Sequence, residues 1–352
     1  MIKKILNHIF IDGLSGMAFG LFATLIIGTI IKQVGTFIGG DIGNYICMFG
    51  SMASAMTSAG IGVGVACKFK ESALVTLSAA TAGMVGGFAG KIMAGTVFVD
   101  GVVTLAGPGE PLGAFVAAMV AIELGHLVSG KTKVDIIVTP FVGIVSGSVV
   151  GLLVGPPISA FMTGLGSIIN WGTEQQPFLM GIVVSVVMGM VLTLPISSAA
   201  LGIVLNLSGL AAGAATVGCC CNMVGFAVAS FKENKTGGLL AQGIGTSMLQ
   251  VPNIMRKPII WLPAIIASAI LGPVSTMLFH MTSNATGSGM GTAGLVGQIM
   301  TWQVMTATES GGIVLLKILL LHFLLPATIA LAASTIMRKK GWIKTGDMKL
   351  EL

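Results

Sequence analysis

The sequence predicts an all-α polytopic membrane protein. Hydrophobic residues make up 54% of the 352 residues and charged residues only 9%, compared with about 25% in a soluble domain. The 51 glycines fit this class, because helices in lipid pack closely through small residues. Windows of about 20 mostly apolar residues, the length that crosses a bilayer, recur along the chain with at most one charge each; they cover 11–31, 134–153, 179–201, 258–278 and 316–336.

The first half of the chain contains five predicted spans. The basic start is followed by an apolar run long enough to cross a membrane, so we interpret it as a retained first helix and not as a signal peptide. The lysines at 3–4, 68–70 and 131–133 then fall on one side, which the positive-inside rule assigns to the cytoplasm. The spans are placed at about 13–33, 43–66, 72–98, 112–129 and 134–156.

The second half is less regular. Residues 179–201 form a span, and 202–230 form either one broken helix or two half-spans. Residues 237–251 are too short and too polar for an ordinary span, which needs about 20 residues, so we expect a re-entrant segment there. Spans at 258–281 and 313–337 flank a Gly/Thr-rich stretch with a second re-entrant piece. The total is about 8–10 transmembrane helices, with both termini cytoplasmic because Arg338, Lys339 and Lys340 end the last span.

Two pairs of segments repeat in the same order and indicate a two-fold internal repeat. Residues 66–71 resemble 230–235, and 138–147 resemble 261–270. Secondary transporters are often built from such repeats, with broken helices at the substrate site. The alternative is compositional coincidence, and the polarity of the repeat stays open. We therefore predict one integral membrane transport domain, 1–352, with halves 1–172 and 173–352.

Polar residues among helix breakers are the predicted solute site, because irregular backbone at membrane depth is tolerated only where it lines protein or water. Thr246, Ser247, Gln250 and Asn253 lie between Gly243 and Pro252 or directly after it and offer donors and acceptors to a hydroxyl-rich or amide-like solute. The alternative is a cytoplasmic loop with a helix cap at Asn253. Asn222 interrupts a long apolar stretch and is included.

Two carboxylates complete the predicted site. Glu309 lies between Thr308 and Ser310, before an apolar helix, and an acid inside a membrane is by default a functional hypothesis. Glu110 is flanked by Gly and Pro. The alternative for Glu309 is an acid at the water interface that favours the start of the following helix.

Other function classes lack their motifs. The sequence contains no phosphate-binding Gly-x-x-x-x-Gly-Lys-Ser/Thr loop, no nucleophile elbow and no His-Glu-x-x-His pair, so we expect no catalytic site of its own. The five cysteines lie in apolar stretches without nearby ligands, and neither a metal nor a cofactor is expected. The formal net charge of +6 is concentrated in short loops, so it indicates topology and not nucleic-acid binding.

The run Gly-Thr-Ser-Met-Leu-Gln-Val-Pro-Asn253, then Arg256-Lys-Pro258 and Trp261-Leu-Pro263, ending in Leu-Gly-Pro273, resembles the membrane (IIC) component of bacterial phosphotransferase systems. The resemblance is to the second IIC group, which includes proteins similar to the perfringolysin regulator PfoR. It implies a sugar permease that works by an elevator-like shift and presents the sugar to separate IIB and IIA phosphocarrier proteins. It also implies a carboxylate and a histidine that contact the sugar, with Glu309 as the carboxylate and His280 or His126 as the histidine.

Three functions therefore stay open. The first is a phosphotransferase-type sugar permease in the cell inner membrane, surrounded by lipid and homodimeric. The second is a membrane-embedded ligand sensor or regulator of the PfoR type. The third is an ion-coupled transporter of a small carboxylate or amino acid. The sequence does not name the substrate or the coupling ion.

Overall fold

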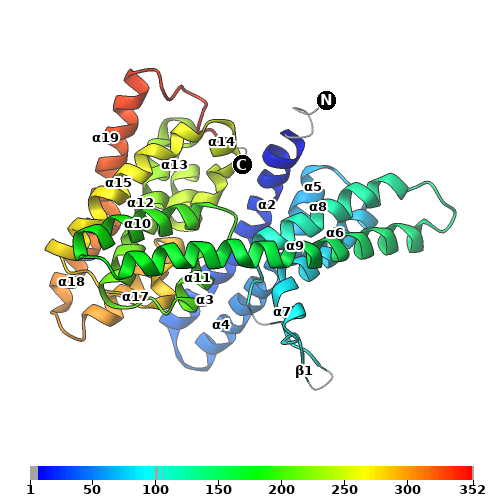
Figure 1. Cartoon of the computed structure of the whole chain (residues 1–352), viewed down its shortest axis with the longest axis horizontal. Coiled ribbons are helices and arrows are strands. Elements are labelled where there is room, and N and C mark those ends of the chain that lie inside the picture. The colour runs from blue at the N-terminus through cyan, green and yellow to red at the C-terminus, as the bar shows by residue number, and fades with distance from the viewer. Residues whose placement is uncertain (1–6, 100–101, 106, 351–352) are drawn as a thin grey trace. The chain divides into compact units, whose positions relative to one another are not determined.

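The computed structural model describes residues 7–99, 102–105 and 107–350, and nearly all its regular elements are helices. The chain divides into two compact units, Met1–Phe161 and Met162–Leu352. The all-α class is confirmed. The two units are described separately (Figure 1).

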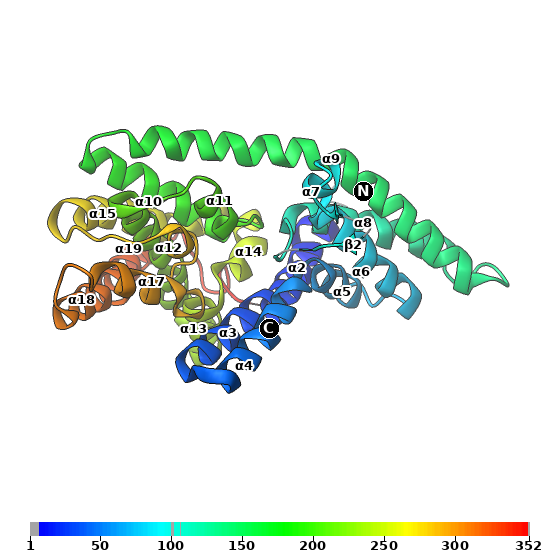
Figure 2. The same cartoon turned by 90° about the horizontal axis from the view of Figure 1, so that it is seen from below.

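Unit 1 begins with one long helix that runs through η1 (His8–Gly13), α2 (Leu14–Leu21), η2 (Phe22–Ile26) and α3 (Ile27–Ile38). The chain reverses at Gly39 and Gly40, whose positive φ angles of 66° and 62° favour glycine. It returns through α4 (Gly40–Ala55) and α5 (Thr57–Lys68), which are bent by 55°. α3 lies beside α4 and α2 beside α5 (Figures 1 and 2).

Glycines set the spacing between α2 and α5. A Cβ atom added at Gly20 would collide with the backbone carbonyl of Gly60, and one added at Gly16 would lie 2.6 Å from the Cα atom of Val65. Helices in lipid use such small residues to bring their backbones together. The remaining elements of unit 1 are α6 (Ala73–Gly87), which packs on α8 (Pro111–Val128), then α7 (Ala89–Met93) and an antiparallel hairpin of β1 (Phe98–Val99) and β2 (Val102–Val103).

α9 (Asp135–Thr173) starts in unit 1 and ends in unit 2. The predicted span ends at 156, whereas the helix continues past Pro156 and Pro157. Membrane helices tolerate proline when other groups satisfy the freed backbone carbonyls.

Unit 2 is organised around α12 (Gly209–Ala229), whose residues are almost all buried. α10 (Pro177–Thr193), α15 (Leu262–Pro273) and α19 (Leu325–Lys339) pack against it. A Cβ atom at Gly218 of α12 would collide with the carbonyl of Ser185, and one at Gly272 of α15 would collide with the carbonyl of Gly181. Glycine therefore allows α10 to contact both neighbours at backbone distance.

The other elements of unit 2 are short and broken. α10 ends at Thr193, within the span predicted for 179–201, because Leu194 is extended before Pro195. Asn206, with a φ of 48°, and Gly209 separate the next short helix from α12, so the stretch 202–230 is a break followed by one full helix. The short elements are α11 (Ser198–Val204), α13 (Phe231–Leu240), η3 (Ala241–Gly245), η4 (Ser247–Gln250), α14 (Val251–Arg256), η5 (Pro258–Trp261), η6 (Val274–Leu278), α16 (Ala285–Ser288), η7 (Ala293–Leu295), α17 (Val296–Met305), α18 (Gly311–Ile318) and η8 (Leu319–Leu324).

Within the described residues, six helices are long and apolar enough to cross a membrane, and the bent pair α4–α5 would add a seventh span. The predicted eight to ten spans are reached only if the shorter apolar helices α6 and α10 also cross. The chain is thus an integral membrane protein. The six are His8–Ile38, Pro111–Val128, Asp135–Thr173, Gly209–Ala229, Pro258–Leu278 and Gly311–Lys339.

Candidate functional site

Asn222 is the centre of a buried polar network in unit 2. Its Oδ1 atom accepts hydrogen bonds from Trp261 Nε1 at 2.8 Å and Thr193 Oγ1 at 3.2 Å. Its Nδ2 atom donates to the carbonyl of Gly218 at 3.2 Å and to Ser268 Oγ at 3.3 Å. Thr193 Oγ1 also lies 2.8 Å from Ser247 Oγ. One amide thus connects α10, α12 and α15 with Ser247, which lies in the broken segment formed by η3, η4 and α14, residues 241–256.

The hydrogen-bonding capacity of Asn222 is fully used. A carboxamide has two donor hydrogens and two acceptor positions, and all four are occupied by protein groups. A buried polar group without partners would cost about 1–3 kcal/mol, so the network stabilises this helix packing. The geometry therefore suits a positioning group, which holds Ser247 and the break at Thr246 in place.

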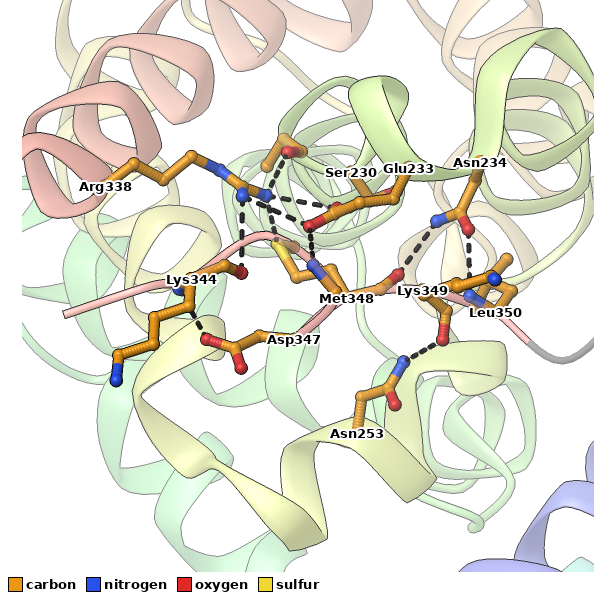
Figure 3. Close-up of polar contacts among 12 residues, drawn as sticks. Ser230, Glu233, Asn234, Asn253, Arg338, Lys344, Asp347, Met348, Lys349 and Leu350 are labelled. Atoms are coloured by element: carbon orange, nitrogen blue, oxygen red, sulfur yellow. Dashed lines mark hydrogen bonds and ion pairs between the residues drawn. The ribbon is translucent and has the colours of Figure 1, made fainter. Parts of the chain in front are cut away.

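A second buried network fixes the rest of the broken segment. Gln242 accepts a 2.8 Å hydrogen bond from Gln250 Nε2, and Gln250 Oε1 accepts one of 2.9 Å from Asn253 Nδ2. The same two donors reach main-chain carbonyls near the end of the chain. Gln250 Nε2 lies 3.0 Å from Met348 O. Asn253 Nδ2 lies 2.9 Å from Lys349 O, a contact drawn in Figure 3. The helix cap at Asn253, the alternative left open from the sequence, is not formed, since the Asn253 side chain bonds Gln250 and the carbonyl of Lys349.

A third group of polar residues has unused capacity. Gln298 Nε2 lies 3.1 Å from His322 Nδ1 and 3.4 Å from Cys220 Sγ, which joins α17, η8 and α12. Thr301 lies one turn after Gln298, on the same face of α17. Among the described residues, Gln298 Oε1, His322 Nε2 and Thr301 Oγ1 are buried without a hydrogen-bond partner.

The contact between Gln298 and His322 indicates which atoms of this group donate and which accept hydrogen bonds. In the amide orientation of this structure, Gln298 Nε2 faces His322 Nδ1 and donates to it, and a neutral imidazole that accepts at Nδ1 carries its proton on Nε2. His322 Nε2–H is thus an open donor, Gln298 Oε1 an open acceptor, and Thr301 Oγ1 can act as either. That combination matches a hydroxyl group, which both donates and accepts. Buried polar groups are normally paired, so these open positions are where a polar ligand would be bound.

Glu309 lies at the turn between α17 and α18, and its carboxylate is paired. Lys317 Nζ donates to it at 2.7 Å and to the carbonyl of Phe279 at 2.8 Å. Thr308 and Ser310, on either side of Glu309, are exposed. This ion pair gives Glu309 a structural role in the turn between α17 and α18, and a ligand that used the carboxylate would have to compete with Lys317.

The structure brings some of the nine sequence-predicted residues together. Asn222 and Ser247 meet through Thr193, Gln250 and Asn253 bond directly, and Thr246 precedes Ser247 in extended conformation. Glu309, Thr308 and Ser310 form a separate group. Glu110 belongs to unit 1, where it precedes α8.

The group with open hydrogen-bonding positions contains no residue chosen from the sequence. His322 carried a usable signal, because a histidine within an uninterrupted apolar run is expensive in lipid and indicates function. His280 and His126, the two sequence candidates, are exposed, and His126 pairs with Glu71 at 3.0 Å in unit 1. Gln298 and Thr301 carried no signal, because their burial depends on contacts with α12 and η8.

The described residues in the interior of unit 2 include few groups that could bind a metal or a charged ligand. Among the described residues, no three or more His, Cys, Asp or Glu side chains are grouped as a metal site. The cysteines at 219–221 are buried in α12, and Cys219 Sγ donates to the carbonyls of Met188 and Ser288 at 3.5 Å each. The three side chains with open positions are therefore suited to a neutral polar ligand.

One comparison with known proteins gives a match, and that match extends over nearly the whole chain. The protein-family model described as "Phosphotransferase system, EIIC" matches residues 11–350. No curated protein matches the chain significantly.

Proposed function

Because the chain belongs to the phosphotransferase system EIIC family, we propose that it is a sugar permease whose sugar site is formed in unit 2 by Gln298, His322 and Thr301. The observation that carries this proposal is that Gln298 Oε1, His322 Nε2 and Thr301 Oγ1, three of the buried side-chain atoms without a hydrogen-bond partner among the described residues, belong to one group of side chains. The broken elements on both sides of this group supply the irregular backbone that transporters use around a substrate.

The chemistry of these three groups favours a sugar over the alternative solutes. A sugar hydroxyl can accept from His322 Nε2–H and donate to Gln298 Oε1, while Thr301 serves a neighbouring hydroxyl. A carboxylate or an amino acid would need a compensating charge, and a charge buried without a partner is strongly unfavourable. Gln298 and Thr301 carry no charge, and neither does a neutral His322.

The sequence-predicted residues take two roles in this proposal. Asn222, Thr246, Ser247, Gln250 and Asn253 hold the breaks of the helices in position, as their satisfied hydrogen bonds support. Glu309, Thr308 and Ser310 form a second candidate contact with the sugar. The Glu309 carboxylate becomes free to bind it when Lys317 moves away. Glu110 would have to reach the sugar from unit 1, and it stays a weaker candidate.

Further properties follow from the family and the charge pattern as part of the same proposal. The protein resides in the inner membrane with both termini cytoplasmic, since Lys339 and Lys340 follow the last span. It works with separate IIB and IIA proteins, as a homodimer, by an elevator-like movement. A sensor that binds a sugar without moving it is the alternative, and it differs only in the absence of uptake.

A binding experiment tests the proposal. The purified protein in detergent is screened against sugars, sugar alcohols, carboxylates and amino acids by thermal shift, since a ligand that binds only the folded state raises its apparent stability. We expect a hit among sugars or sugar alcohols that is lost in Gln298→Met and in His322→Asn.

Two exposed positions supply matched controls. Gln303 lies on the same helix as Gln298 but faces outward, and His280 is exposed. Gln303→Met and His280→Asn should therefore keep the sugar-dependent shift. A hit limited to carboxylates or amino acids, or equal loss in the control variants, would contradict the assignment.

A further inference from the structure

The end of the chain folds back over the broken segment of unit 2. After α19, residues 341–350 continue without a helix or a strand, yet several of their side chains are buried. Met348 is 0% exposed and Ile343 2% exposed, and both pack with Phe226, Ile254 and Trp261. We name residues 341–350 the strap. Thr345 and Lys349 of the strap are exposed, so its buried face is apolar and its exposed face is polar apart from Trp342.

The strap is held largely through its main chain. Asn234 donates to the carbonyl of Met348 at 2.8 Å and accepts from the amide of Leu350 at 2.8 Å (Figure 3). Gln250 and Asn253 donate to the carbonyls of Met348 and Lys349. Three carboxamides thus bind one short stretch of backbone.

One ion pair anchors the strap directly, and a second fixes the carboxylate that binds its main chain. Arg338 makes a two-pronged contact with Glu233, with both nitrogen–oxygen distances at 3.1 Å, and Glu233 Oε1 also accepts from the amide of Gly346 at 3.0 Å. Lys257 Nζ lies 2.6 Å from Asp347 Oδ2. Two-pronged arginine–carboxylate pairs have a defined geometry as well as a favourable energy. Glu233 and Lys257 lie on either side of the broken segment in sequence, so the strap connects its two ends.

We propose that the strap is a releasable lock, which holds residues 241–256 in the observed position and lets them move only when it detaches. Gln250 and Asn253 connect the two parts, because each bonds to the broken segment and to the strap at once. A segment without regular secondary structure can detach locally, since sub-global opening needs less free energy than unfolding. The consequence for sugar movement rests on the proposed function, whereas the lock itself does not.

Hydrogen exchange, measured without any sugar on the full chain and on variants, tests the lock. A chain that ends at Lys340, and the single variant Met348→Ala, should exchange residues 241–256 about tenfold faster or more, as expected when a local opening becomes easier. α17 (Val296–Met305), in the same unit, should keep its exchange rates. A synthetic peptide of residues 341–350 added to the shortened chain should restore the protection of 241–256.

Two controls make the result decisive. Thr345→Ala, an exposed change within the strap, should leave exchange at 241–256 unchanged. The same peptide carrying Met348→Asp should not restore protection. Unchanged exchange in the shortened chain, acceleration spread over the whole of unit 2, or failure of the unmodified peptide would each overturn the lock. A protein that binds no sugar would instead contradict only the proposed function.

Discussion

Buried carboxamides in unit 2 differ in whether their hydrogen bonds are complete. Asn222 uses all four of its positions on protein groups, whereas Gln298 leaves its oxygen without a partner among the described residues. Residue type and burial are similar, so the difference lies in the neighbours. A satisfied amide stabilises the fold, and an unsatisfied one is a position where a ligand gains affinity.

Removing the Asn222 side chain should destabilise the protein. Asn222→Ala leaves Trp261 Nε1 without its acceptor and removes one of the partners of Thr193 Oγ1, which keeps Ser247. A buried donor left unsatisfied costs about 1–3 kcal/mol. Denaturation in detergent should therefore show a clear loss of stability. Asn170→Ala, at an exposed position of α9, is the control and should change stability by less than about 0.5 kcal/mol. Equal losses of stability in the two variants would show that Asn222 is not the centre of a stabilising hydrogen-bond network.

Asp347 makes the strap sensitive to acid. Burial alone would raise the pKa of this carboxyl, but the hydrogen bond from Lys257, the amide of Lys344 and the charges of both lysines lower it below its usual value. A depressed pKa adds stability above the pKa of the unfolded chain, about 3.9, and that stability is lost as the pH falls through the folded-state value. Strap attachment should be unaffected by pH between about 6 and 8 and should weaken below about pH 4.

The pH effect can be measured by limited proteolysis of the strap with an acid-tolerant protease. Cleavage should increase as the pH falls through the acid range. Asp347→Asn should already be cleaved faster at pH 6 and should respond less to acid. A variant that responds to acid as strongly as the unmodified chain would show that another group is responsible.

At the level of elements, close approach through glycine decides how α10, α12 and α15 pack. A methyl group at Gly218 would collide with the Ser185 carbonyl, which belongs to the backbone and cannot rotate away. Overpacking usually costs about 1–3 kcal/mol, occasionally more. These contacts also position Ser185, whose hydroxyl donates to the carbonyl of Ser268 at 2.8 Å on α15.

Gly218→Ala should therefore lower stability clearly, whereas Gly312→Ala should not. Gly312 lies in α18, and a Cβ atom added there would meet no neighbouring atom within 4 Å, so alanine should be neutral or stabilise the helix by about 0.5–1 kcal/mol. The melting temperatures of the two variants in one detergent give the comparison. Equal melting temperatures would show that α10 and α12 are not in backbone contact.

The α17–α18 turn offers a test of Glu309. Glu309→Gln leaves Lys317 without its carboxylate in a half-buried position, so we expect a lower melting temperature, and Lys317→Met added to it should recover much of the loss. Sugar binding is measured on both variants. If sugar binding returns in the double variant, Glu309 stabilises the α17–α18 turn. If binding stays lost, Glu309 contacts the sugar.

At the scale of the whole molecule, the orientation in the membrane follows from charges near the ends of spans. Lys339 and Lys340 lie at the end of α19, and the strap continues from them. If both termini are cytoplasmic, the chain crosses the membrane an even number of times. The strap would then face the cytoplasm, where separate phosphocarrier proteins would approach.

Reporter fusions test this orientation. A reporter that is active only in the cytoplasm should be active after Leu350, and one that is active only outside the cytoplasm should be inactive there. Fusions after Lys131 should behave in the same way, since this loop carries the predicted cytoplasmic lysines. The opposite pattern at both positions would invert the topology and place the strap outside.

The sequence by itself determined the class of this protein, because the scarcity of charge and the repeated apolar windows leave only a bilayer as solvent. It also predicted an irregular segment at 237–251 from its glycines and polar residues, and this range overlaps the broken segment 241–256. Tertiary structure decided which buried polar groups have all their hydrogen bonds satisfied. In sequence, Asn222 and Gln298 are polar residues among apolar neighbours, and Glu309 is an acid between two hydroxyl residues. Only the packing of α10, α15, η8 and Lys317 around them shows that Asn222 has complete hydrogen bonds, that Gln298 has an open acceptor and that Glu309 forms an ion pair. Hydrogen bonds between residues 24 to 98 positions apart depend on which helices meet, and the local pattern of one helix does not contain that information.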